Sequence, residues 1–152
     1  MSAEIGAPAP AFSLRNPDKE VMSLDDFKGR KTLVVFIPFP FTGNCEDELC
    51  TLRDHLADLN DLDANVVAIT CDTPFANGAW SKQNGFGFPV LSDFWPHGET
   101  CQAYGAFNEA TGSANRVTFV LDADGVIRGI IDSGSLAVTR EYDAYVEALA
   151  KI

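Results

Sequence analysis

Two apolar segments separated by a leucine-striped helical segment constrain the fold of this chain more than any other feature. Residues 31–38 and 64–70 are rich in β-branched and aromatic side chains, which is typical of buried strands. Between them, residues 44–60 repeat leucine at helical spacing. The stripe consists of Leu49, Leu52, Leu56 and Leu59. A strand, a helix and a second strand in this order predict a parallel β–α–β unit.

The second half of the chain predicts an antiparallel addition to that unit. Residues 116–121 and 126–131 read as two strands, and Asp122-Ala123-Asp124-Gly125 between them is a strong hairpin turn. The other expected elements are a strand at 11–14, a helical turn at 23–27, helices at 75–84, 98–104 and 137–150, and an extended piece at 88–93. We therefore expect an α/β fold with a mixed central sheet and helices on both faces. This arrangement resembles the thioredoxin-like fold, and the strand order rests on that resemblance.

Length and composition are those of a globular protein with a full core. The 152 residues suit one domain, so we expect residues 1–152 to form a single domain. No apolar run reaches the roughly 18 residues that a membrane span requires. The first residues contain neither a basic nor an apolar signal-peptide region, which predicts a cytoplasmic protein.

The charge balance excludes some classes of partner. The chain has 22 acidic and 11 basic residues and a net charge of −11. Such a chain is repelled by nucleic acid and by anionic membranes, so neither is expected as a partner. The acidic residues are spread along the sequence, which fits a solvated surface; adaptation to a high-salt cytosol is the alternative.

The loop between the first buried strand and the helix places a thiol where negative charge is stabilised. Thr42 lies in a proline-broken loop, and Cys45 opens the helical segment. The first turn of a helix offers unpaired backbone N–H groups and a positive dipole end. A cysteine there is favoured as a thiolate, the reactive form of the side chain.

Other residues could turn this thiolate into a peroxide-reactive centre. Cleavage of an O–O bond needs hydrogen-bond donors for the leaving oxygen, and the Thr42 hydroxyl and the Cys45 N–H are candidates. Pro38 offers a rigid wall without an N–H group. Arg116, at the head of a predicted strand, is the candidate cation. An arginine at a strand end is also commonly just a solvated charge.

The same residues carry a resemblance to a known family. The pattern Pro38-x-x-x-Thr42-x-x-Cys45 matches the peroxiredoxin signature Pro-x-x-x-Thr/Ser-x-x-Cys. Residues 88–98, 103–109 and 112–120 resemble the AhpE-like branch of that family. The match extends over most of the chain.

The resemblance implies a role for each candidate residue. Cys45 is similar to the peroxidatic cysteine, whose thiolate reduces hydrogen peroxide or an organic hydroperoxide and becomes a sulfenic acid. Thr42 would bond the thiolate and the peroxide, Arg116 would hold both, and Pro38 would shield them. Glu48 matches a position that often bonds the arginine, although an acid also suits the first turns of a helix. We therefore expect neither a cofactor nor a metal in this chemistry.

Three alternatives stay open for the thiol that reacts with the sulfenic acid of Cys45. Cys45 and Cys50 form a Cys-x4-Cys pair, which departs from AhpE-like proteins and resembles the Q-type (bacterioferritin-comigratory) peroxiredoxins, where the second cysteine resolves the first. In an intact helix these Cα atoms lie about 8–9 Å apart, more than the usual 4.4–6.8 Å of a disulfide. The helix would have to unwind locally. Cys101 is a rival, and an external thiol is the third alternative; Cys71 reads as an inert core residue.

The expected partners follow from this chemistry. They are a hydroperoxide and a thioredoxin- or glutaredoxin-like protein or a low-molecular-weight thiol, with a homodimer as a possible assembly. One alternative is a peroxide sensor that passes oxidation to a partner. A thioredoxin-like disulfide reductase would need Cys-x-x-Cys, which the sequence lacks. A zinc site from Cys45, Cys50, His55 and Cys71 would lack the usual ligand spacing.

Overall fold

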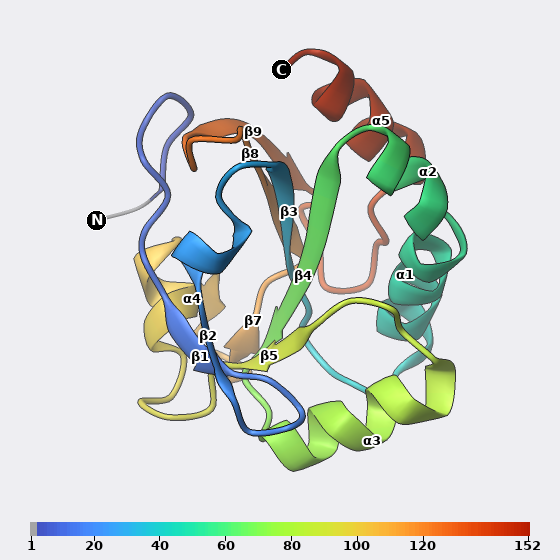
Figure 1. The fold of residues 1–152 in the computed structure, drawn as a ribbon. Coiled ribbons are helices and arrows are strands. Elements are labelled where there is room, and N and C mark those ends of the chain that lie inside the picture. The colour runs from blue at the N-terminus through green and yellow to red at the C-terminus, as the bar shows by residue number, and fades with distance from the viewer. Residues whose placement is uncertain (1–2) are drawn as a thin grey trace.

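The computed structural model describes residues 3–152, which are built around a seven-stranded mixed sheet (Figure 1). The strand order is β2-β1-β5-β4-β3-β8-β9. The strands are β1 (Ser13–Arg15), β2 (Val21–Ser23), β3 (Lys31–Phe36), β4 (Ala64–Thr70), β5 (Val90–Ser92), β8 (Val117–Leu121) and β9 (Ile127–Asp132). The short strands β6 (Phe107–Asn108) and β7 (Ser113–Ala114) pair separately. β3, β4 and β5 are parallel, whereas β8 and β9 add an antiparallel hairpin beside β3.

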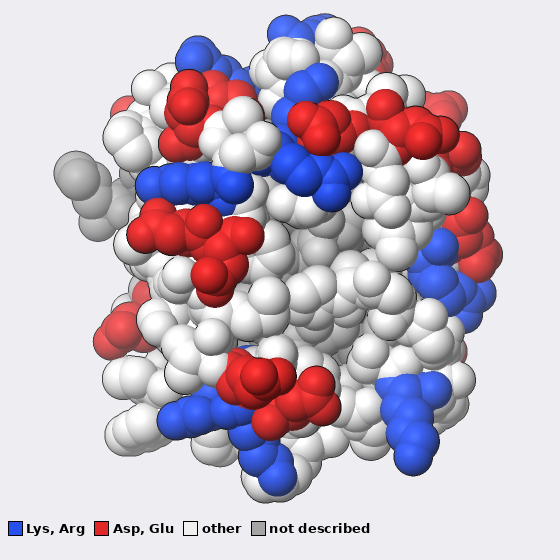
Figure 2. Space-filling model, in the orientation of Figure 1, with Lys and Arg blue, Asp and Glu red and all other residues white. Residues whose placement is uncertain are grey.

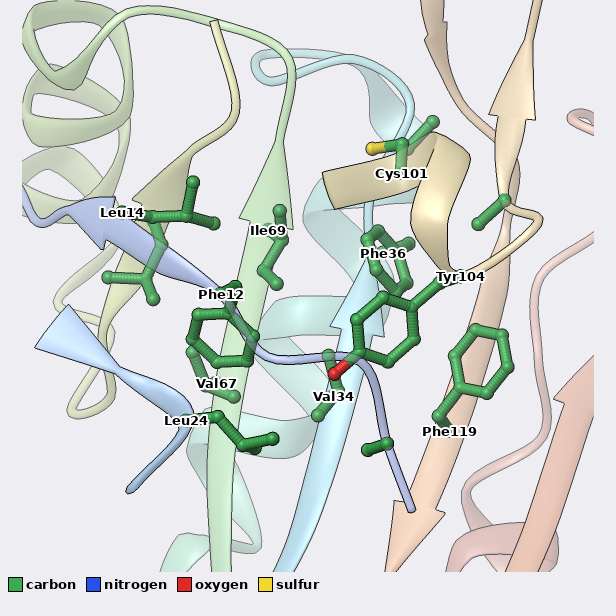
Figure 3. Packing of buried hydrophobic residues seen from close by; sticks show 14 of the residues in the cluster. Phe12, Leu14, Leu24, Val34, Phe36, Val67, Ile69, Cys101, Tyr104 and Phe119 are labelled. Carbon is green, nitrogen blue, oxygen red and sulfur yellow. The ribbon is translucent and has the colours of Figure 1, made fainter. Parts of the chain in front are cut away.

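Helices cover both faces of this sheet, as the sequence predicts (Figure 1). They are the 3-10 helix η1 (Leu24–Phe27) and the α-helices α1 (Gly43–Asp54), α2 (Leu56–Asp61), α3 (Pro74–Asn84), α4 (Glu99–Ala103) and α5 (Tyr142–Ala150). Because successive side chains of a strand point to opposite faces, Leu33 and Val35 of β3 pack under α1 and α5. Val34 and Phe36 of the same strand pack against α4 and the N-terminal segment, as Figure 3 shows.

The sheet places the start of α1 beside its most buried strands. β3 is paired on both sides, with β4 and with β8. The chain leaves β3 at Phe36, passes Pro38 and enters α1 at Gly43. In open α/β sheets, functional groups gather beyond the carboxyl ends of parallel strands. The first turn of α1 occupies that position here.

Some boundaries differ from the sequence-based expectation. The helix expected over 44–60 is divided at His55, whose ring stacks on Tyr142 with centroids 4.1 Å apart. The closing helix begins at Tyr142 instead of residue 137, because residues 137–141 form a loop that hydrogen-bonds to α1. β2 and the β6–β7 pair were not expected, because these strands are too short to show a recognisable period in the sequence.

Acidic and basic side chains are interspersed on the visible face of the molecule (Figure 2). On the face shown in Figure 2, acidic side chains form separate groups with basic side chains between them, and no continuous basic area is visible. In the described part of the chain, no helix is long and apolar enough to cross a membrane.

Candidate active site

Cys45 lies in the first turn of α1 with its side chain fully buried. Its neighbour Thr42 is the N-cap residue, and the Thr42 carbonyl accepts the Glu46 N–H at 2.9 Å to begin the helical ladder. Cys45 is 0% exposed and packs in the core cluster beneath α1. The helix N-terminus predicted from the sequence is therefore present, with the thiol directed inward from it.

Arg116 directs its guanidinium onto this sulfur. It immediately precedes β8, and its Nη2 donates to Cys45 Sγ at 3.2 Å. Nε and Nη2 also donate to the Leu136 carbonyl, at 3.0 and 2.8 Å. Arg116 is only 3% exposed, so its charge acts on the sulfur with little screening by water. A cation in this place stabilises a thiolate and can also bind the oxygens of a small substrate.

Glu48 joins Arg116 to a second arginine. Glu48 lies one turn after Cys45, and its Oε1 accepts a hydrogen bond from Arg116 Nη1. Arg140, in the loop before α5, donates to the two carboxylate oxygens from Nε at 2.8 Å and Nη2 at 2.9 Å, and from its backbone N–H at 2.6 Å. Its Nη1 reaches the Phe36 carbonyl at 2.9 Å and Thr118 Oγ1 at 3.1 Å. Glu48 thus fixes both guanidinium groups.

The two arginines favour the ionised form of the Glu48 carboxylate. Burial opposes the charge of Glu48, but the hydrogen bonds and charge of Arg140, together with Arg116, outweigh it and hold the pKa of Glu48 below its ordinary value. Burial likewise lowers the pKa of Arg116, and contacts with Glu48 and Cys45 more than offset this, so the pKa of Arg116 is raised. Arg116 stays a cation beside the sulfur.

Thr42 and Pro38 occupy the loop that leads into α1. Pro38 is buried, in keeping with a wall of the site. The exposed Thr42 hydroxyl donates to the Phe39 carbonyl at 2.6 Å, and no hydrogen bond joins it to the Cys45 sulfur in the described residues. The structure therefore brings Arg116 directly to the thiol and Glu48 to Arg116, whereas the Thr42 hydroxyl is bonded to the loop backbone.

The other cysteines are distributed over both faces of the sheet. Cys50 lies on α1, half-buried, with its sulfur 3.8 Å from Asn84 Oδ1. α1 is continuous from Gly43 to Asp54, so Cys45 and Cys50 are separated by intact helix. Cys101 belongs to the core cluster on the opposite face of the sheet from Cys45. Its sulfur lies 3.6 Å from that of Cys71.

Comparison with known proteins decides the family. Residues 5–130 match the family model described as the AhpC/TSA family. Alkyl hydroperoxide reductase E of Mycobacterium tuberculosis is 44% identical over 149 residues, which cover 97% of each chain. The chain belongs to the AhpC/TSA family, the peroxiredoxins. Peroxiredoxin Bcp of Escherichia coli is 32% identical over 130 residues and 82% of each chain.

Solved structures agree with the fold of this peroxiredoxin. The structure of Mycobacterium bovis AhpC has a TM-score of 0.86 and 26% identity, and covers 98% of this chain and 92% of that one. Peroxidoxin BcpB from Mycobacterium tuberculosis has a TM-score of 0.85 at 24% identity, with 97% and 95% covered. The expectation of a thioredoxin-like peroxiredoxin fold is confirmed.

Sequence reasoning about this peroxiredoxin missed Arg140. The residue fell inside the helix expected over 137–150, where an arginine reads as a solvated charge. In the structure its backbone N–H and side chain bind Glu48, which holds the segment out of helical geometry. A signal was available: Val138 and Thr139 are β-branched residues that weaken the start of a helix.

The zinc site considered from sequence is not formed. Within residues 3–152, the one group of potential ligands close enough to share an ion comprises Cys71, Asp93 and Cys101. Cys45, Cys50 and His55 take no part in it. His55 is hydrogen-bonded to the Thr51 carbonyl at 3.0 Å and stacks on Tyr142.

Proposed function

We propose that this peroxiredoxin reduces hydroperoxides through the Cys45 thiolate. The sulfur attacks the terminal oxygen of the hydroperoxide, the O–O bond breaks, and the departing oxygen takes a proton to leave as water or an alcohol. Cys45 becomes a sulfenic acid. The observation that supports this most is the buried contact of 3.2 Å between Arg116 Nη2 and the Cys45 sulfur at the start of α1.

Substrate entry requires movement of the loop before α1. Cys45 has no exposed surface in this conformation. Phe39 and Phe41 in the loop are exposed, and Phe41 has a strained left-handed φ of +66°. A small displacement of this loop would uncover the sulfur and free the Thr42 hydroxyl from Phe39. Thr42 could then donate to the peroxide while Arg116 stabilises the charge developing on oxygen.

Cys50 is the proposed resolving cysteine, and its attack requires α1 to unwind. The thiolate of Cys50 attacks the sulfenic sulfur of Cys45, forms the S–S bond and releases hydroxide, which leaves as water after protonation. Glu46 resists the unwinding, because its carboxylate accepts from Trp80 Nε1 at 3.1 Å and Asn84 Nδ2 at 3.0 Å on α3. The helix that positions Cys45 is thus also the segment that must open during turnover.

The Cys50→Ser variant tests the identity of the resolving residue. We expect one equivalent of peroxide to oxidise Cys45 as in the wild type, but the sulfenic acid to persist. Peptide mapping of the wild type should find a Cys45–Cys50 disulfide, and mapping of the variant should find a dimedone adduct at Cys45. A Cys45–Cys101 bridge in the wild type would contradict the assignment.

Disulfide formation is expected to accelerate with pH. Burial raises the pKa of the Cys50 thiol; the negative charges of Glu46, Asp54 and Asp47 act in the same direction, and Arg53 opposes them. A cysteine thiol is mostly protonated at neutral pH even without this shift, and the acidic neighbours remain close in sequence when α1 unwinds. Stopped-flow fluorescence should show the rate of the resolving step rising about tenfold per pH unit between pH 7 and 8. A rate independent of pH in this interval would contradict attack by the Cys50 thiolate as the slowest part of the resolving step.

The proposed reductant is a dithiol protein of the thioredoxin or glutaredoxin type, or a low-molecular-weight thiol, in the cytoplasm. Such a thiol attacks the Cys45–Cys50 disulfide and restores both thiols by exchange. A homodimer is the proposed assembly, to be measured by analytical ultracentrifugation. Sustained consumption of peroxide with a thioredoxin-like reductant supports the enzyme, whereas oxidation that stops after one equivalent would favour a sensor.

A further inference from the structure

A second cluster of thiols lies across the sheet from the peroxidatic site. Cys71 directly follows β4, and Cys101 lies on α4. Their sulfur atoms are 3.6 Å apart, and both belong to the core cluster of which Figure 3 labels Cys101. Cys45 belongs to the other cluster, so the peroxidase mechanism does not use this pair.

A carboxylate completes the cluster. Asp93 directly follows β5, the parallel neighbour of β4, and its N–H donates to the Thr70 carbonyl at 2.7 Å. Parallel strands bring the residues after their carboxyl ends to the same edge of the sheet. Cys71 and Asp93 therefore lie side by side, with Cys101 above them on α4. One ligand atom from each of the three residues lies within 4.8 Å of the others.

We propose that Cys71, Cys101 and Asp93 bind a thiophilic divalent cation of the Zn²⁺ class. Two sulfur atoms bound at about 2.3 Å to a tetrahedral ion lie roughly 3.8 Å apart, close to the observed 3.6 Å. A disulfide would require the same atoms to approach to about 2.05 Å. The three ligands are positioned by the ends of β4 and β5 and by α4.

The buried carboxylate of Asp93 is a second observation in favour of a bound cation, and it is independent of the distance between the sulfur atoms. Asp93 is 2% exposed, yet no Lys, Arg or His in residues 3–152 forms an ion pair with it. Within the described residues, its carboxylate oxygens accept only the backbone N–H groups of Thr100 at 3.0 Å and Cys101 at 2.8 Å. Buried carboxylates are normally paired with a cation or bound to a metal. Each oxygen keeps a free lone pair for that purpose.

Metal binding leaves the net charge of the cluster of Cys71, Cys101 and Asp93 unchanged. Two thiols and one carboxylate together carry a net charge of −1. An ion of charge +2 that displaces two thiol protons gives two thiolates, one carboxylate and the same net charge of −1. Zinc sites with three protein ligands keep a fourth position for water. Asp93 and Thr100 line a cavity of about 360 Å³ that can supply it.

The experiment isolates this pair of thiols. The chain contains four cysteines, so the full-length Cys45→Ser/Cys50→Ser protein retains only Cys71 and Cys101. Anaerobic titration with Co²⁺ should produce a sulfur-to-cobalt charge-transfer band that saturates at one equivalent. Added Zn²⁺ should abolish the band and raise the melting temperature of the protein.

Further substitutions in the same background identify the ligands. Cys101→Ser or Cys71→Ser should remove the band, and Asp93→Asn should weaken Co²⁺ binding at least about tenfold. Asp72→Asn, next to Cys71 but outside the cluster, is the matched control and should leave binding unchanged. Circular dichroism verifies that each variant is folded, and Asp93→Asn keeps the test valid if a cysteine variant is not.

Three results would overturn the proposal. They are the absence of a band, a band that survives Cys101→Ser, and equal binding by the Asp93→Asn and Asp72→Asn variants. Formation of a Cys71–Cys101 disulfide in place of metal binding would reassign the pair as a redox couple. Because Cys45 and Cys50 are absent from the tested protein, none of these results depends on the peroxidase mechanism.

Discussion

Cys45→Ser is expected to abolish the reduction of hydroperoxides. A serine hydroxyl is not ionised near neutral pH, so Arg116 would face a neutral and weakly nucleophilic group in place of a thiolate. We expect kcat/KM to fall at least about 1,000-fold, a loss of roughly 4 kcal/mol of transition-state stabilisation. Stopped-flow measurement of peroxide consumption with a saturating dithiol reductant gives this value directly.

Cys50→Ser is the matched control for that loss. It makes the same change of sulfur to oxygen on the same helix, five residues away. The control should retain a burst of one equivalent of peroxide, whereas Cys45→Ser should show none. If Cys45→Ser kept activity within tenfold of the wild type, another residue would have to be the nucleophile.

The candidate site was predictable where it depends on local sequence. Pro38, Thr42 and Cys45 lie within eight positions of one another, and the strand before them and the helix after them follow from side-chain periodicity. Arg116 comes from a distant strand, and only its place at a strand head together with a family resemblance suggested it. Strand pairing then brings it to the sulfur, since β8 lies beside β3.

The remaining parts depend on tertiary contacts that leave no local pattern. Arg140 is held in an irregular loop by Glu48, although the surrounding residues were expected to be helical. The pair of Cys71 and Cys101 is 30 positions apart in the chain, and neighbouring parallel strands and α4 bring its sulfurs together. In both cases a contact across the fold overrides or bypasses the local preference.

The second large effect is expected from Glu48→Gln, which removes the negative charge between two buried guanidinium groups. Arg116 and Arg140 would remain buried without the carboxylate that joins them. Removal of one partner from a buried charge network costs about 3–5 kcal/mol of unfolding free energy. For a chain of this size that lowers the melting temperature by roughly 10 °C. Calorimetry at pH 7 measures the change.

Glu46→Gln is the control for this substitution. It makes the same chemical change two residues earlier, at a half-exposed side chain. The amide oxygen of Gln can still accept from Trp80 and Asn84, as Glu46 does. We expect a cost below about 1 kcal/mol. Equal destabilisation by the two substitutions would contradict a special role for the Glu48 charge.

The pH dependence of stability separates a charge effect from a loss of packing. The pKa of Glu48 is lower in the folded protein than its ordinary value of 4.5. Its carboxylate therefore stabilises the fold fully above that ordinary value, and this contribution is lost as the pH falls through the lowered pKa. The Glu48→Gln variant lacks the contribution at every pH, so its deficit relative to the wild type should be largest near neutrality and shrink in acid. A deficit that stays constant from pH 7 to pH 3 would show that Glu48 acts through its shape and neutral hydrogen bonds, not through its charge.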